Sequence, residues 1–332
     1  MGVCPNKENG LSMACVLVTG AAGLLGTELC LQLRTAKYEV IGVDNLSRYT
    51  LLGEAGVRDQ ITNAKALMAA GVQFRQEDFR HVGVGGADAV VHAAAQVCHS
   101  RKGKFDNPSD DVQTNIVGTV DLLEQARVAK LPLLFISSAK VYGENVDRQP
   151  QPTDESCPLG DQTHLTFFGA SKVAADLFAQ MYAIKYETPV GVFRPGCFTG
   201  QWALATEAQN FFGWLVHCAL KRHKYNVFGD GEQVRDHLDV RDLAAACIKW
   251  IGRPTSGVWN VGGGPSNAES LNVSIHRVET LTGTKVSKVF CRPRLGDIRS
   301  LVLNSRKLSD DYNWAPKYSL TEIVEELISC AA

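Results

Sequence analysis

The chain has 332 residues, of which 45% are hydrophobic and 21% are charged, a composition typical of a soluble globular protein. Its formal net charge of −1 gives no reason to expect nucleic acid or an anionic membrane as a partner. No apolar run reaches the roughly 18 residues that a membrane-spanning helix needs, and residues 1–12 lack the apolar stretch of a signal peptide.

Short apolar runs alternate with helical spacing through the first part of the chain. Strands are predicted at 15–19, 40–43, 73–74, 89–92, 133–136 and 190–193, and helices at 24–34, 111–130 and 171–186. Apolar strands that alternate with helices predict a parallel sheet covered on both faces, which is a Rossmann-type doubly wound α/β domain. We expect residues 1–13 to be a disordered lead-in and residues 14–195 to form this domain.

The alternation of apolar strands with helices becomes less regular after about residue 195. Helices are expected at 209–221, 241–251, 271–282 and 320–328, with short strands near 227, 258–260 and 286–290. Residues 196–332 are therefore predicted to form a smaller C-terminal α/β domain that closes over the carboxyl edge of the sheet. This prediction leaves open that elements of the two domains alternate along the chain.

A glycine-rich turn directly follows the first predicted strand and opens the first helix. It contains Gly20, Gly23, Leu24, Leu25 and Gly26. Glycines permit close approach of a pyrophosphate, and the helix N-terminus favours negative charge. Asp44 ends the next strand, where a carboxylate accepts hydrogen bonds from an adenosine ribose and favours NAD over NADP. The neighbouring Arg48 weakens that preference, and a structural turn with a solvated aspartate is the alternative.

Three further motifs follow in order: Asp78-Phe79 after the third strand, His92-Ala93-Ala94 at the end of the fourth, and an N-x-x-G-T motif that begins at Asn115. Together with the glycine turn they make residues 14–328 resemble the extended short-chain dehydrogenases/reductases, specifically the NAD-dependent nucleotide-sugar epimerase/dehydratase family. The resemblance implies NAD as cofactor and a nucleotide-diphosphate sugar as substrate, bound by the smaller domain. Besides the turn, it assigns to the cofactor site Asp44, Asn45, Ser47, Arg48, Asp78, Phe79, His92, Ala93, Ala94, Asn115, Ser137, Lys172, Arg194 and Gly196.

The resemblance also assigns the catalytic residues. In the family, the hydroxyl at Ser138 bonds the sugar hydroxyl that is oxidised. Phe168 and Lys172 occupy a Y-x-x-x-K unit in which the family has tyrosine at the first position. That tyrosine removes a proton from the sugar hydroxyl, with its pKa lowered by the lysine. A phenyl ring can neither give nor take a proton, so the activity of this chain is the central question.

Three explanations of Phe168 remain open. The natural enzyme has tyrosine and this copy was altered to trap a complex, or the protein is naturally impaired and binds its ligands without turnover. In the third explanation another group supplies the base, and Tyr142, His164 and Cys197 are the candidates.

Ala139 and Lys140 follow Ser138 at the positions where family dehydratases usually carry Asp-Glu. A lysine does not replace a carboxylate as an acid–base group at unchanged pKa. This pair therefore favours epimerisation, by oxidation and re-reduction at one carbon, over dehydration or decarboxylation. Lys140 also resembles the version of this motif in the CDP-sugar 2-epimerases of the family, which act on CDP-tyvelose and CDP-paratose.

Two arginine-containing motifs in the last third of the chain resemble substrate-binding elements of the family. Arg235 and Arg299 would hold the diphosphate, because a guanidinium fork suits phosphate oxygens, and Asp297 would bind a nucleotide ribose. The substrate site assigned in this way consists of Gln96, Ser138, Lys140, Phe168, Cys197, Gln233, Arg235, Asp297 and Arg299. Exposed arginines on turns are the alternative.

Assembly and location are also expected from the sequence. The helices at 111–130 and 171–186 resemble the pair that forms the family's dimer, so a homodimer is expected, unless both helices only cover the sheet. The ten cysteines include no C-x-x-C pair, and no His/Cys/Asp spacing suggests a metal site. Reduced thiols in a cytoplasmic protein are therefore expected.

Overall fold

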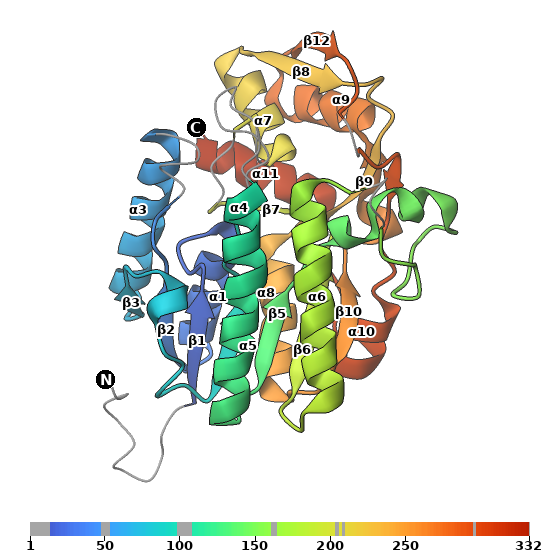
Figure 1. Cartoon of the computed structure of the whole chain (residues 1–332). Coiled ribbons are helices and arrows are strands. Elements are labelled where there is room, and N and C mark those ends of the chain that lie inside the picture. The colour runs from blue at the N-terminus through green and yellow to red at the C-terminus, as the bar shows by residue number, and fades with distance from the viewer. Residues whose placement is uncertain are drawn as a thin grey trace.

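The protein was analysed as a computed structural model, which describes residues 14–47, 54–97, 108–160, 165–202, 206–207, 210–294 and 297–331. Figure 1 shows a large sheet with helices on both faces, and above it a smaller group of strands and helices. No helix among the described residues is long and apolar enough to cross a membrane.

Seven parallel strands form the large sheet, in the order β10-β6-β5-β4-β1-β2-β3. They are β1 (Cys15–Thr19), β2 (Glu39–Val43), β3 (Gln73–Arg75), β4 (Ala89–His92), β5 (Leu133–Ile136), β6 (Val190–Pro195) and β10 (Gly257–Val261). Every residue of β1, β4, β5 and β6 is buried, because helices cover both faces. The predicted Rossmann-type sheet is confirmed, and its strand order reverses between β1 and β4.

The alternation of side chains along the strands builds a core on each face of the sheet. Val16 and Val18 of β1 join the core on the side of α1 (Leu24–Thr35) and α8 (Val240–Gly252). Leu17 joins the opposite core, under α5 (Gly118–Ala129) and α6 (Phe167–Lys185). Figure 1 shows α5 and α6 side by side in front of the sheet. Helix α3 (Glu54–Ala69), which the sequence analysis did not predict, packs beside α1.

Strand β10 comes from the last third of the chain, yet it belongs to the large sheet. It pairs in parallel with β6, with Trp259 opposite Phe193, and these two rings meet edge to face at 6.0 Å. The sequence predicted a strand near 258–260 but assigned it to the smaller domain, because apolar spacing does not say which sheet a strand joins. The domain boundary between residues 195 and 196 remains a prediction. Helix α8 and strand β10 follow that boundary in the chain but pack with the first domain.

The smaller part is built around β9 (Val234–Asp239), which the sequence analysis took only as a motif. This strand is parallel to β7 (Cys197–Thr199) and β13 (Ser300–Leu301) and antiparallel to β11 (Ala268–Ser270). A second pair consists of β8 (Lys224–Phe228) and β12 (Ser287–Cys291). The helices of this region are α7 (Phe211–Lys221), α9 (Leu271–Thr282) and α11 (Leu320–Ala331), whereas α10 (Arg306–Tyr312) packs against β10 and α8 of the large sheet.

Two helices next to the sheet differ from the prediction in ways that matter for the site. Helix α6 begins at Phe167 rather than Ser171, because the hydroxyl of Thr166 caps it by accepting a hydrogen bond from the Gly169 amide at 3.1 Å. Phe168 therefore lies in its first turn. The predicted helix 111–130 is α4 (Pro108–Asp111) and α5, joined by η2 (Val112–Val117), a π-helical segment of a kind often found at functional sites.

Candidate functional site

A cavity of about 480 Å³ opens at the carboxyl ends of the central strands, where the strand order reverses. Such a position is where open α/β sheets bind ligands. The wall contains the glycine turn and Asp44 on one side and Ser138, Lys140 and Phe168 on the other. Residues predicted for the cofactor and residues predicted for catalysis therefore lie around one space.

The glycine turn has no room for side chains at two of its positions. Gly20 has a φ of +70°, and a Cβ there would lie 2.7 Å from the backbone nitrogen of Ala94. A Cβ on Gly26 would lie 2.0 Å from the carbonyl oxygen of Gly20. The N-cap of α1 is Gly23, and no side chain caps this helix. The turn is thus a cradle of bare backbone at a helix N-terminus, which fits the pyrophosphate of a dinucleotide.

Acidic side chains line the cavity at the ends of β2 and β3. The carboxylate of Asp44 accepts hydrogen bonds from the amides of Ala22 at 3.0 Å and Leu46 at 2.8 Å, so it also fixes the glycine turn. Asp78 is paired with the Arg80 side chain, whose hydrogen bonds lower the pKa of this carboxyl to about 2. Asn45 donates to Asp78 at 3.1 Å. The cavity is also lined by Leu24, Leu25, Ser47 and Phe79. Arg48 lies outside the described residues.

His92 and Asn115 lie behind the cavity wall rather than in it. The ring nitrogens of His92 are 2.7 Å from the Thr19 hydroxyl and 3.0 Å from the Thr119 hydroxyl. Burial lowers the pKa of His92 to about 3, so the ring is neutral. Its neighbours Ala93 and Ala94 do line the cavity.

Asn115, in the π-helical segment, holds the cavity wall in place. It accepts a hydrogen bond from the Gln96 amide at 2.8 Å and donates to the Gln96 carbonyl at 2.9 Å. Its amide also donates to the Ser171 hydroxyl at 2.9 Å, which joins η2 to α6. Gln96 itself lines the cavity. Asn115 thus positions a wall residue without facing the cavity itself.

Ser138 and Phe168 face the same space from two different elements. Ser138 caps η3 (Ala139–Arg148), which follows β5, and its hydroxyl oxygen accepts a hydrogen bond from the Lys140 amide at 3.1 Å. Among the described residues this hydroxyl donates to no protein group, so its proton can be donated into the cavity. Phe168, which is 9% exposed, presents a ring without a titratable atom.

Lys172 lies one helical turn beyond Phe168, and its ammonium points at the sheet. It donates a hydrogen bond to the Ile136 carbonyl at 2.7 Å and lies 4.4 Å from the centre of the Phe135 ring. Burial lowers the pKa of Lys172 to about 7. Lys172 is not part of the cavity wall, although Ile136 is. The predicted contact of Lys172 with the cofactor remains a prediction.

Ser137 and Arg194 belong to a buried network instead of the cavity wall. Both bind Asp176: the Ser137 hydroxyl donates at 2.6 Å, and Arg194 makes two bonds of 2.9 and 2.8 Å. Arg194 also donates to the Tyr142 hydroxyl at 3.1 Å, which itself donates to Asn260 at 2.7 Å. The contact of Ser137 and Arg194 with the cofactor remains a prediction, although the polar side-chain atoms of both residues bind partners inside the protein.

The same network argues against Tyr142 as the group that replaces the missing base. Tyr142 is fully buried, its hydroxyl is committed to Asn260, and burial raises its pKa to about 12. It is not part of the cavity wall. Cys197 does line the cavity, but burial raises the pKa of its thiol. His164 lies outside the described residues.

With this geometry in place, the chain can be compared with known proteins. A family model described as the NAD dependent epimerase/dehydratase family matches residues 16–262. The chain belongs to this family. The sequence-based assignment to the NAD-dependent nucleotide-sugar epimerases and dehydratases is therefore confirmed.

Relatives in the family include enzymes with different sugar nucleotides in their names. A UDP-glucose 4-epimerase of Mycolicibacterium smegmatis is 28% identical over 320 residues, with 94% of this chain and 96% of the relative covered. A CDP-paratose 2-epimerase of Salmonella typhi is 26% identical, with 94% and 97% covered. A solved structure of a Tyr→Phe mutant of UDP-glucuronic acid 4-epimerase from Bacillus cereus, in complex with UDP-4-deoxy-4-fluoro-glucuronic acid and NAD, has a TM-score of 0.83 at 25% identity, with 96% and 98% covered.

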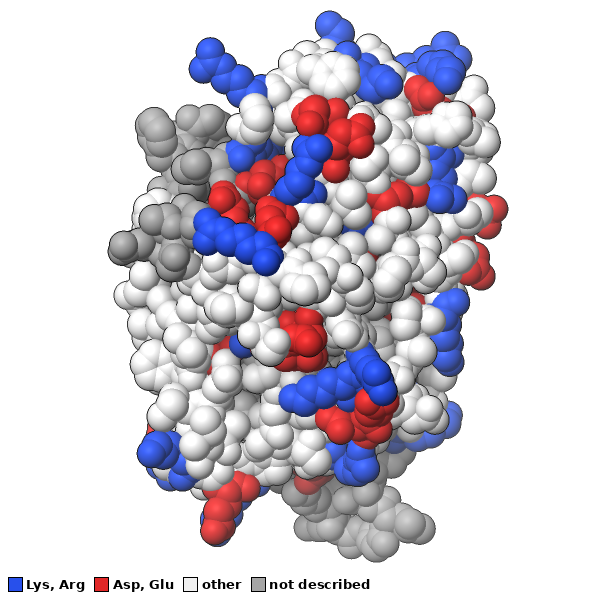
Figure 2. Space-filling view, turned by 90° about the vertical axis from the view of Figure 1, so that its right-hand side faces the viewer, with Lys and Arg blue, Asp and Glu red and all other residues white. Residues whose placement is uncertain are grey.

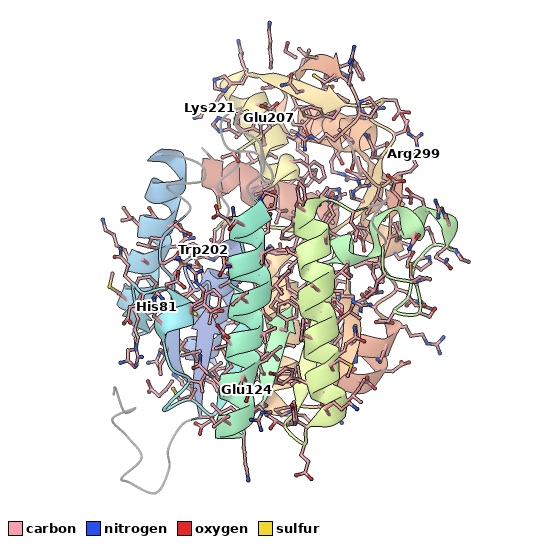
Figure 3. All side chains as sticks on the ribbon, viewed as in Figure 1. His81, Glu124, Trp202, Glu207, Lys221 and Arg299 are labelled. Carbon is pink, nitrogen blue, oxygen red and sulfur yellow. The ribbon has the colours of Figure 1, made fainter. Side chains whose placement is uncertain are left out.

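The two arginines predicted to bind the family's substrate lie on adjacent segments, because the Val234 amide donates to the Arg299 carbonyl at 2.9 Å, but their side chains pair with different carboxylates. Arg235 donates to Asp297 at 2.7 Å, and Gln233 donates to the same carboxylate at 3.4 Å. Arg299 instead pairs with Asp230 at 2.8 Å and lies at the edge of the molecule in Figure 3. None of Gln233, Arg235, Asp297 and Arg299 is part of the cavity wall, so their contact with substrate remains a prediction.

Several cavity residues had no signal in the sequence. They are Gln60, Thr114, Thr199, Asn210, Phe211, Phe212, His237 and Leu301. Half of them lie in helices, and three come from the strands of the smaller sheet, whose pairing brings Cys197 opposite His237. His237 directly follows the Arg235-Asp236 motif, which is the one signal that could have marked it. Burial lowers the pKa of His237 to about 3.

Neither the surface charge nor the metal-ligating side chains of the described residues indicate a further binding site. Figure 2 shows Lys and Arg interspersed with Asp and Glu, so the visible face carries no field of a single sign. Among the described residues, no group of three or more His, Cys, Asp or Glu side chains is arranged to hold a metal ion.

Proposed function

We propose that the protein is an NAD-dependent epimerase of a nucleotide-diphosphate sugar. It would oxidise one sugar hydroxyl to a ketone and reduce that ketone from the other face. The observation that supports this proposal is the single cavity that the glycine turn, Ser138, Lys140 and Phe168 share. Residues for holding a dinucleotide and residues for binding a sugar hydroxyl thus lie on opposite sides of one space.

The residues of the turn fit NAD as the cofactor. The bare backbone at Gly20, Gly23 and Gly26 would hold the pyrophosphate, and Asp44 would hold the adenosine ribose. When bound, NAD supplies the reversible removal of two electrons from a sugar carbon. Ser138 would donate a hydrogen bond to the oxygen of that carbon, which orients the sugar and stabilises negative charge on the oxygen.

The residues next to Ser138 favour epimerisation over elimination. The cavity wall has Ala139 and Lys140 there, so no pair of carboxyl groups is available to remove water from the sugar. Within the family we propose a CDP-sugar 2-epimerase, because Lys140 and its neighbours resemble that branch. The relatives named above include both UDP-sugar and CDP-sugar enzymes, so the nucleotide and the carbon have to be determined by assay.

A second candidate function is a protein that binds NAD and a nucleotide sugar without turning the sugar over. One observation favours it: Phe168 presents a phenyl ring to the cavity where the family has a phenol. The loss of a general base typically slows a reaction by about 10²–10⁴-fold. The rest of the cavity would be the same in a protein that only binds these ligands as in an enzyme that converts the sugar.

The test is product analysis by NMR after incubation of the protein with NAD and with CDP-, UDP- and GDP-sugars in turn. An epimerase is expected to convert one of these sugars into its epimer, and Ser138→Ala is expected to slow that conversion while NAD still binds. Calorimetry on the same samples measures binding. Tight binding of a nucleotide sugar with no isomerisation would support the second candidate, and no binding of any of them would reject both.

We also propose that the protein is a cytoplasmic homodimer that pairs through α5 and α6. The outward face of α6 carries the exposed side chains Leu177, Phe178, Met181 and Ile184, and contiguous apolar surface of this kind marks interfaces. A cytoplasmic location is supported by the cysteines, because each one in the described part of the chain is a free thiol.

A further inference from the structure

We propose that the side-chain amine of Lys140 carries the proton that a phenol at position 168 would carry in the family. The inference rests on the proposed function, because it names the general base for that reaction. Lys140 follows Ser138 by two positions, and both residues line the cavity beside Phe168. The group that orients the sugar oxygen and the group that would take its proton therefore come from one short segment.

The amine of Lys140 has no partner that would hold it away from a ligand. Within the described residues its Nζ makes no hydrogen bond and no ion pair, and only its backbone amide is engaged, by Ser138. Lys172 differs in this respect, because its ammonium donates to the Ile136 carbonyl and takes no part in the cavity wall. Of the two lysines, Lys140 alone faces the space where a sugar would lie.

The surroundings of Lys140 favour the uncharged amine, which is the form that accepts a proton. Burial lowers the pKa of Lys140 first, and the positive charge of Arg235 lowers it further, with a smaller contribution from Arg294. Cys197 and Asp297 act in the opposite direction. The carboxylate of Asp297 is already paired with Arg235 at 2.7 Å, which limits its attraction for a second cation.

The other titratable groups in this part of the wall are poorer proton carriers. Burial raises the pKa of the Cys197 thiol, so the basic thiolate is disfavoured. His237 stacks on Phe212 at 4.3 Å, and burial holds its pKa near 3, so its ring is a weak base. Burial and the charge of Arg235 instead lower the pKa of Lys140, toward the working pH that general acid–base catalysis requires.

The proton transfer balances with the chemistry of the family. During oxidation the O–H bond of the sugar hydroxyl breaks and an N–H bond to Nζ forms, which converts the amine to an ammonium. The hydrogen on the carbon that bears this oxygen leaves with the two electrons of its C–H bond, as a hydride, for which oxidised NAD is the acceptor. During reduction the hydride returns to the opposite face of the carbonyl carbon, and the ammonium returns its proton to the oxygen.

Four variants test the proposal by epimerisation rate: Lys140→Met, Lys140→Arg, Phe168→Tyr and the double variant Lys140→Met/Phe168→Tyr. We expect the unaltered protein to be active and both single Lys140 variants to be slowed by about 10²–10⁴-fold. Arginine keeps the positive charge but cannot release a proton, so it separates proton transfer from charge. The double variant is expected to regain activity, because the phenol supplies the proton carrier. Lys249→Met, at an exposed site on α8, is the control.

The outcomes separate this inference from the function on which it rests. If neither the unaltered protein nor Phe168→Tyr converts any nucleotide sugar, the proposed function fails. If Phe168→Tyr is active while the unaltered protein is not, the function holds and the role of Lys140 is rejected. Activity of Lys140→Arg equal to that of the unaltered protein also rejects it, because a fixed positive charge would then suffice.

A second measurement does not depend on turnover. Reductive methylation with ¹³C-formaldehyde labels the lysines, and the NMR signal that Lys140→Met lacks belongs to Lys140. We expect that signal to titrate at a lower pH than the signals of the exposed lysines, and the titration to shift when NAD is added. Titration of Lys140 with the exposed lysines overturns the proposal.

Discussion

Asp236 is a completely buried carboxyl group directly behind the cavity. One of its oxygens accepts hydrogen bonds from the amides of Leu303 at 3.0 Å and Gly264 at 3.4 Å, whereas the other, Oδ1, has no partner among the described residues. Burial raises the pKa of Asp236 to about 7. The folded protein therefore holds a proton here that an unfolded chain gives up near pH 4.

This proton makes stability depend on pH at a single residue. A raised pKa in the folded state stabilises the protein fully below about pH 4, and the contribution is lost as the pH rises through about 7. Asp236→Asn cannot titrate, so the free energy of unfolding of the unaltered protein relative to this variant is expected to fall by more than about 1 kcal/mol between pH 5 and pH 8. Urea denaturation at both pH values measures it. A difference that does not change with pH would show that Asp236 is ionised in the folded protein.

Residues at the ends of strands were predictable from the sequence, but the direction of their side chains was not. Asp44 and Ser138 line the cavity as expected, because motifs after apolar strands lie at the carboxyl edge of a parallel sheet. Ser137 precedes Ser138 in extended backbone, where successive side chains point to opposite sides, so it reaches Asp176 instead. His237 was missed because its place depends on the pairing of β7 with β9.

The turn between β1 and α1 is the element in which sequence and structure agree most directly. Gly26→Ala would place a Cβ 2.0 Å from the Gly20 carbonyl oxygen, so the turn has to open. We expect a loss of about 1–3 kcal/mol in the free energy of unfolding and NAD binding weakened by at least about tenfold, measured by denaturation and calorimetry.

The matched control for Gly26→Ala is Gly252→Ala, at the end of α8. A Cβ at Gly252 meets no atom within 4 Å, so stability and NAD binding are expected to stay close to those of the unaltered protein. NAD binding by Gly26→Ala as tight as that of the control would contradict the cofactor site proposed for this turn.

Elements with strong helical periodicity were predicted well, and charged strands were not. Helix α9 spans the predicted residues 271–282. In contrast, β9 carries Arg235, Asp236, His237 and Asp239, all of which are buried. Its residues do not show the apolar pattern of a strand, because buried polar side chains such as Arg235 find tertiary partners, here Asp297. A pattern of hydrophobicity cannot anticipate such partners.

At the scale of the whole molecule, the apolar face of α5 and α6 predicts association. Ile184 is 72% exposed on α6 and Val128 is 67% exposed on α5. Near the same face, Glu124 of α5 bonds Arg127 and the Tyr182 hydroxyl, which joins the two helices, and Figure 3 shows Glu124 at the front of the molecule.

Charges placed on this face are expected to separate the protomers. Leu177→Glu/Met181→Glu adds two carboxylates one turn apart on α6, where both native side chains are exposed, so the fold of each protomer should survive. Light scattering after size exclusion is expected to show a dimer for the unaltered protein and a monomer for this variant. Val273→Glu, on an exposed part of α9, is the control and should remain a dimer. A monomeric unaltered protein would reject the proposed pairing.

The position of β10 at the edge of the large sheet also has a consequence for biosynthesis. A chain emerging from the ribosome completes β6 long before β10, so the outer edge of β6 exposes unpaired backbone groups during translation. The sheet cannot reach its full width until Val261 has been made. The nascent protein therefore depends on the intervening segment, or on a chaperone, to shield that edge from neighbouring chains.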